Sequence, residues 1–184
     1  MNQRIQSTWD LLVGHVAVDA EESEYKARML AMCDLGQGRD PFARDHFIPG
    51  HFTASAFVLS PREDALLLIH HAKLDRWLQP GGHVDAEDED LLAAARREVR
   101  EEGGVRELEL LGKGAFDLDV HAIPALKGDP AHQHFDVRFL FRARDQRFVA
   151  GSDAKAARWV ALSEIDPEIS DRSVMRAVEK ILAR

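Results

Sequence analysis

The sequence predicts an α/β protein, and three features carry that prediction. Stretches of alternating apolar and polar residues, typical of strands, recur between residues 52 and 162. Stretches with apolar residues at helical spacing occur in the first 35 residues, before residue 104 and at the end of the chain. The chain has 184 residues, of which 45% are hydrophobic, so it can build the core of one domain with an extension.

Residues 1–45 are predicted to form an N-terminal helical extension, and residues 46–184 the main domain. Ser7 to Asp10 can cap a first helix. Glu21 to Leu35 carries apolar residues at helical spacing, and the glycines that follow end this second helix. Three roles are open for the extension: packing on the sheet, a homodimer contact, or closure of a ligand cleft. We favour packing.

The first half of the main domain is predicted to contain two strands, a glycine turn and a helix. Their expected positions are strands at Phe52–Leu59 and Ala65–Ile69, a turn at Gly81-Gly82 and a helix from Asp88 to Gly103. The glycine pair allows backbone shapes that other residues resist and lets a ligand approach the main chain. The acidic residues at 88–90 suit the N-terminus of a helix.

Two further strands, Phe116–His121 and His132–Phe141, alternate strictly between apolar and polar residues. A hairpin register with His121 opposite His132 would set Asp119 opposite His134 and Asp117 opposite Asp136. The expected result is a polar sheet face of three aspartates, three histidines and an arginine. This face lines a substrate cleft or is a half-exposed sheet surface. A short strand at 157–162 and a last helix capped by Asp171 complete the chain.

Charge and composition exclude several classes of partner. The net charge is −8, from 24 basic and 32 acidic residues, which argues against binding to nucleic-acid polymers or anionic membranes. No stretch approaches the ~20 apolar residues that span a bilayer, and the N-terminus lacks a hydrophobic signal region. The single cysteine, Cys33, excludes an internal disulfide, fits a cytoplasmic location and is interpreted as a packing residue.

Three glutamates at offsets of three and four give the main chemical signal. Glu98, Glu101 and Glu102 fall on one face of the expected helix, where like charges repel. A hard divalent cation would turn that repulsion into coordination, because such ions prefer carboxylate oxygens. The alternative is a solvated acidic face, which the glycine turn upstream makes the weaker interpretation.

This stretch resembles the Nudix box, Gly-x5-Glu-x7-Arg-Glu-U-x-Glu-Glu-x-Gly-U, in which U is a bulky aliphatic residue. Its second half matches position by position from Arg97-Glu98 through Gly104 and Val105. The first half carries one extra residue. Counting from Gly82 places the first acid at Asp88, whereas counting back from Arg97 places it at Glu89. The resemblance leaves open which of the two fills that position.

Membership of the Nudix family implies an α/β/α sandwich around a mixed sheet and a hydrolase that cleaves diphosphate linkages with Mg²⁺ or Mn²⁺. By this resemblance Glu98 and Glu102 are the main metal ligands, and Glu101 joins them or acts through water. The carbonyl of Gly82 is a further ligand, and Arg97 holds a glutamate in position. The general base is a box glutamate or a residue from a distant loop, and we favour Glu98.

The resemblance implies a small nucleotide as the substrate, and we favour a nucleotide sugar or ADP-ribose. Modified nucleoside triphosphates and capped or dinucleoside polyphosphates are the alternative. Candidate substrate contacts are His83, His134, Asp136 and Arg138.

Two other functions and one other metal site are the remaining alternatives. A non-catalytic, nucleotide-sensing module would be favoured by loss of a box glutamate, but all three are present. An isoprenoid diphosphate isomerase of the same fold relies on a cysteine in its core, whereas Cys33 lies in the extension. A zinc site made of His132, His134 and a nearby aspartate is chemically allowed but lacks further ligand spacing.

Overall fold

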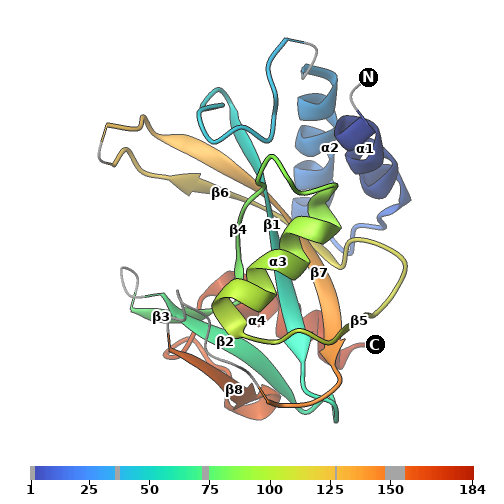
Figure 1. The fold of residues 1–184 in the computed structure, drawn as a ribbon, viewed down its shortest axis with the longest axis vertical. Coiled ribbons are helices and arrows are strands. Elements are labelled where there is room, and N and C mark those ends of the chain that lie inside the picture. Colours follow the sequence, from blue (N-terminus) through green and yellow to red (C-terminus); the bar gives the residue numbers. More distant parts are fainter. Residues whose placement is uncertain (1–2, 36–37, 72–74, 127, 148–155) are drawn as a thin grey trace. The chain divides into compact units, whose positions relative to one another are not determined.

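The computed structural model describes residues 3–35, 38–71, 75–126, 128–147 and 156–184 (Figure 1). Helices and strands follow in the order α1 Gln3–Gly14, α2 Ala20–Leu35, β1 Gly50–Leu59, β2 Ala65–His71, β3 Arg76–Leu78, β4 Gly81–His83, α3 Leu91–Gly103, β5 Leu108–Leu110, β6 Asp117–Ile123, β7 His132–Ala143, β8 Ala157–Ala161 and α4 Arg172–Leu182, with a 3₁₀ turn at Leu162–Glu164. The predicted α/β class and the N-terminal helices are confirmed.

Hydrogen-bonded strands follow the order β3-β2-β1-β7-β5, with β4 paired to β1, β6 to β7 and β8 to β2. The chain divides into two compact units. The first comprises Met1–Ala54, Gly82–Ala94 and Gly112–Arg138, and the second Ser55–Gly81, Ala95–Leu111 and Phe139–Arg184. Strands β1 and β7 and helix α3 each run through both units. The predicted boundary at residue 45, between an N-terminal extension and a main domain, stays a prediction.

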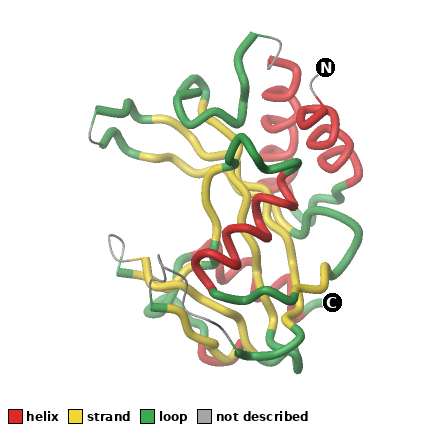
Figure 2. The backbone as a smooth tube through the Cα atoms, viewed as in Figure 1, coloured by secondary structure: helices red, strands yellow, loops and turns green. Residues whose placement is uncertain are grey.

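In the first unit, the two N-terminal helices lie side by side (Figure 1 and Figure 2). A buried carboxylate connects them to β6. Glu22, which has no exposed surface, accepts a hydrogen bond from the backbone N–H of Leu118 at 3.0 Å and contacts His15 Nε2 at 2.9 Å. A carboxylate that is this buried costs free energy unless it is paired. The helices are therefore fixed to the strand by a specific polar contact as well as by apolar packing.

In the second unit, both faces of β2 are covered. Leu66, Leu67 and Leu68 follow one another in sequence and are all fully buried, although successive strand residues point to opposite faces. Gly103, at the end of α3, lies against the side chain of Leu67, and Figure 1 shows α4 behind the strands of this unit. As predicted, Asp171 caps α4, and its carboxylate accepts from the N–H of Val174 at 2.9 Å. None of the described helices is both long and apolar enough to cross a membrane.

The predicted pairing of the two polar strands was wrong by two residues. In the structure His121 lies opposite His134, Asp119 opposite Asp136 and Asp117 opposite Arg138. Both registers place two aspartates opposite each other, Asp117 and Asp136 in the predicted one and Asp119 and Asp136 in the observed one. In the observed register Arg138 pairs with Asp117, Asp119 and Asp136, and its positive charge compensates the opposed carboxylates.

Candidate active site

Helix α3 presents the glutamates because its ends and its apolar stripe are well specified. The side chain of Asp90 accepts from the N–H of Ala93 at 2.7 Å and so caps the N-terminus. Ala95 and Val99 have no exposed surface, so their side of the helix packs into the apolar core. Gly104, with φ of 66°, follows the last helical residue in the conformation that ends helices.

The three glutamates differ in exposure, and each has a polar partner. Glu98 is 9% exposed, Glu102 is half-buried and Glu101 is exposed. Arg97 Nη1 donates to Glu98 Oε1 at 2.8 Å and to Glu101 Oε2 at 3.0 Å, so two carboxylates converge on one guanidinium nitrogen. Glu102 Oε2 accepts from the N–H of Gly81 at 3.2 Å. This contact joins the end of the helix to Gly81, the first residue of β4, so the glycine pair forms a short strand where the sequence predicted a turn.

The electrostatics of this cluster suit a cation. Burial raises the pKa of Glu98, the pairing with Arg97 opposes that rise, and the charges of Glu102 and Glu101 add to it. The protein alone therefore does not fully compensate the negative charge of the buried carboxylate. Mg²⁺ and Mn²⁺ prefer carboxylate oxygens, so the donor type of these side chains suits such an ion, and their role as metal ligands stays a prediction.

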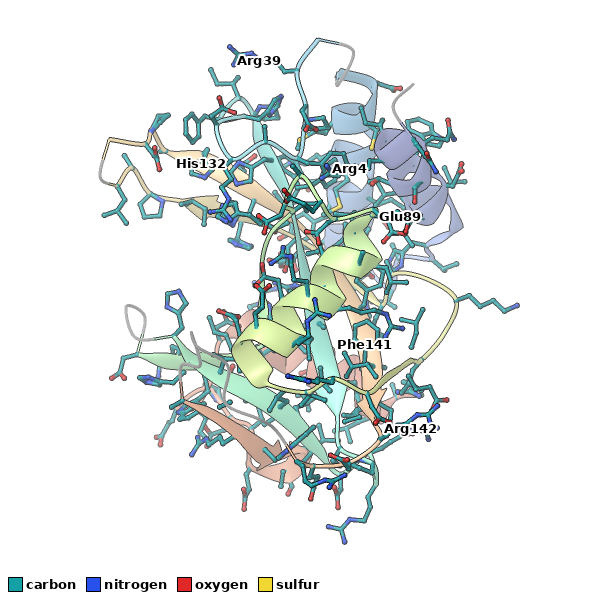
Figure 3. The ribbon with its side chains drawn as sticks, in the orientation of Figure 1. Arg4, Arg39, Glu89, His132, Phe141 and Arg142 are labelled. Carbon is teal, nitrogen blue, oxygen red and sulfur yellow. The ribbon has the colours of Figure 1, made fainter. Side chains whose placement is uncertain are left out.

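The two acids that compete for the first box position have different surroundings. Asp88 is 7% exposed, and its Oδ2 accepts from the N–H of Asp85 at 2.8 Å, which fixes the loop before α3. Glu89 is exposed (Figure 3). Gly82 lies in β4 and is half-buried. The ligand role of its carbonyl stays a prediction.

The polar face of β6 and β7 is buried around an arginine, which differs from a half-exposed sheet surface. Arg138 is 2% exposed and reaches three aspartates. Its Nε donates to Asp136 at 2.8 Å, its Nη2 to Asp119 at 2.9 Å and its Nη1 to Asp117 at 3.3 Å. Burial by itself lowers the pKa of Arg138, but the three carboxylates raise it above its usual value. Two of the predicted substrate contacts, Arg138 and Asp136, therefore contact each other in a buried ionic cluster.

The other two predicted contacts, His83 and His134, lie with their ring centroids 5.3 Å apart. The structure adds His51, which the sequence reasoning missed; its ring centroid is 5.0 Å from that of His83 and 4.8 Å from that of His134. A signal for it exists in β1, where His51, Thr53 and Ser55 occupy alternate positions between apolar residues. Such spacing marks one face of a strand, and Thr53 indeed donates to Asp136 at 3.1 Å.

Comparison with known proteins gives a match to a family model, a relative in sequence and several solved structures of similar fold. The family model described as "NUDIX domain" matches residues 49–178. A "Probable DHNTP pyrophosphohydrolase" of Lactococcus lactis subsp. cremoris is 36% identical over 96 residues, which are 51% of this chain and 55% of that protein. The chain therefore spans about half the length of this curated relative.

Two solved structures share the fold at lower sequence identity. A C. elegans Ap4A hydrolase binary complex has a TM-score of 0.55 and 22% identity, covering 72% of this chain and 95% of that one. The E. coli dihydroneopterin triphosphate pyrophosphohydrolase has a TM-score of 0.54 and 17% identity, covering 72% and 96%. At these identities the likeness concerns the fold.

Proposed function

The chain belongs to the Nudix family, and from this premise we propose that it hydrolyses a phosphoanhydride bond of a small nucleotide-like substrate with Mg²⁺ or Mn²⁺. The observation that carries the proposal is the cluster on α3, in which Arg97 joins Glu98 and Glu101 and the Gly81 N–H joins Glu102. These contacts orient carboxylates along one helix next to the glycine pair of β4. An acidic face that served only solubility would need no such fixed partners.

Each residue of the cluster has a proposed role. Glu98 and Glu102 hold the metal ion, and Glu101 joins them directly or through water, with the Gly82 carbonyl as a further ligand. Arg97 keeps two carboxylates in position. Glu98 is also our candidate base, because its raised pKa makes the carboxylate a better proton acceptor than an ordinary glutamate. A bound Mg²⁺ would supply positive charge for the phosphate oxygens and would acidify water.

For the substrate, we propose a nucleotide-like triphosphate or dinucleoside polyphosphate as the first class to test. The names of the relatives support this choice, since they describe hydrolases of DHNTP and Ap4A. Nucleotide sugars and ADP-ribose, the substrates that we expected from the family resemblance, stay the alternative prediction. The half-buried His83 and His134 stay candidate substrate contacts.

A substrate panel tests the proposal. The purified protein is incubated with triphosphates, dinucleoside polyphosphates, nucleotide sugars and ADP-ribose, with and without Mg²⁺, and the products are separated. Pyrophosphate from a triphosphate, or a nucleoside monophosphate from a diphosphate-linked compound, identifies the bond that is cleaved. Turnover that does not need a metal, or no turnover of any member, would contradict the enzymatic proposal. Tight binding without turnover would favour the sensing module.

Glu102→Gln should lower kcat by at least about 100-fold, because a neutral amide is a much poorer metal ligand than a carboxylate. Its thermal midpoint should stay close to that of the wild type. Glu179→Gln is the matched control, since Glu179 is an exposed glutamate of helix α4. Equal activity of the two variants would show that the ligand assignment is wrong.

A further inference from the structure

Five histidine rings gather in the first unit of the chain. His51 comes from β1, His83 from β4, His121 from β6, and His132 and His134 from β7 (Figure 3 labels His132). Six pairs of these rings have centroids 4.8–5.4 Å apart. In the described part of the chain, three of them, His51, His132 and His134, offer nitrogen atoms that all lie within 4.8 Å of one another. The roles proposed for the glutamates do not involve these rings, and only His83 and His134 among them are candidate substrate contacts.

The backbone explains how His51 reaches the other two. His132 and His134 are two residues apart on β7, so their side chains point to the same face of the strand. Gly50, with φ of 151°, lies so close to Gln133 that a Cβ atom there would collide with its carbonyl oxygen. This contact holds β1 against β7 at the residue between the two histidines. The next residue along β1 is His51.

Hydrogen bonds select the tautomers. His51 Nδ1 lies 3.4 Å from the carbonyl oxygen of His46, and His132 Nδ1 lies 2.9 Å from that of Pro130. A carbonyl can only accept, so in both rings Nδ1 carries the hydrogen, and in the neutral ring Nε2 carries the lone pair. Metal-binding histidines commonly show this arrangement, with one ring nitrogen donating to the backbone and the other facing the ion.

His51 Nε2 is an independent indication of a ligand site. The residue is 1% exposed, and this nitrogen is buried without a hydrogen-bond partner among the residues that the structure describes. A buried polar atom that lacks a partner costs free energy and calls for an explanation. A metal ion bound to the lone pair would supply that partner.

We propose that His51, His132 and His134 bind a borderline transition-metal ion such as Zn²⁺, with a ligand set that shares no residue with the glutamates. His134 would then serve as a zinc ligand instead of a substrate contact. Tetrahedral zinc with Zn–N bonds of ~2.1 Å places its ligand nitrogens about 3.4 Å apart. The three nitrogens are within 4.8 Å, so small side-chain rotations suffice. Imidazole ligands favour zinc, copper, nickel and cobalt, whereas Mg²⁺ prefers oxygen, so the two sets of residues select different ions. Zinc here would connect β1 to β7.

Zinc binding is measured by titration calorimetry. The protein is first stripped of transition metals and then kept in millimolar Mg²⁺, which occupies carboxylate sites. We expect one zinc ion per chain and a higher thermal midpoint with zinc. X-ray absorption of the zinc-loaded wild type should show nitrogen at ~2.0–2.1 Å with the outer scattering of about three imidazoles. A shell of oxygen alone, or no binding beyond the Mg²⁺ background, would overturn the proposal. This spectrum needs no variant, so it decides the question even if a histidine substitution prevents folding.

Variants then assign the ligands. His132→Gln should weaken zinc binding at least 100-fold, because His132 is half-buried and supplies one of three ligands. The matched control is His121→Gln, which removes an exposed histidine whose Nδ1 pairs with Asp119 at 2.9 Å, and it should bind zinc as the wild type does. Equal losses in both would refute the three-residue assignment. Glu102→Gln should keep zinc binding, and its loss there would instead locate the zinc at the glutamates.

Discussion

Replacing Arg138 with methionine should destabilise the protein strongly, because the substitution leaves three buried aspartates without their cation. Methionine keeps much of the volume of the arginine stem but cannot donate a hydrogen bond. Asp117, Asp119 and Asp136 are at most 7% exposed, and each receives one nitrogen of the guanidinium. The loss therefore concerns charge and hydrogen bonding more than packing.

Its magnitude follows from this burial. Removing one partner of a buried ion pair costs about 3–5 kcal/mol, and Arg138 serves three carboxylates, so we expect at least the middle of that range. In a chain of this length each kcal/mol lowers the thermal midpoint by about 2–4 °C. The expected decrease is therefore roughly 8–16 °C. Adding Asp136→Asn to the variant should recover part of it, because one uncompensated charge is removed.

The assay is thermal and urea unfolding of both variants and of Arg142→Met. Arg142 lies on the same strand (Figure 3) and also pairs with two acids, Glu63 and Glu109, but it is 37% exposed. Water screens such pairs, so its loss should be much smaller. Equal losses at the two arginines would refute the argument from burial. A large fall in kcat/KM for Arg138→Met with an unchanged midpoint would instead support the predicted substrate contact.

Three further changes probe other parts of the chain. Asp171→Ala should cost about 1 kcal/mol of unfolding free energy in urea, because the α4 cap is lost. Gly50→Ala should cost more than ~1 kcal/mol, since its backbone suits glycine and a Cβ would collide with Gln133; Gly14→Ala, in open space, should change little. Cys33, whose pKa burial raises to about 12, should resist thiol reagents at pH 8 and react once the chain is unfolded; rapid reaction of the folded protein would contradict its burial.

Elements with a local cause were predictable from the sequence. Asp171 caps α4, and the acidic residues before Leu91 precede α3, because capping depends on residues a few positions apart. The same holds for the glutamates of α3, which share a helix face through their spacing alone. The hydrogen-bond partners of these glutamates could not be predicted from the sequence. The bond between Glu102 and Gly81 joins residues 21 positions apart, which no local pattern encodes.

The register of β6 and β7 could not be predicted from the sequence, for a geometric reason. A shift by one residue would turn every side chain to the opposite face, and the apolar pattern excludes it. A shift by two preserves both faces, so hydrophobic alternation cannot distinguish the predicted register from the observed one. The observed pairing is favoured by the ion pair between Asp117 and Arg138, an electrostatic preference that binary patterning omits. The observed register also opposes Asp119 and Asp136, so the deciding feature is that one guanidinium, that of Arg138, reaches all three aspartates, a contact that pairwise patterning cannot encode.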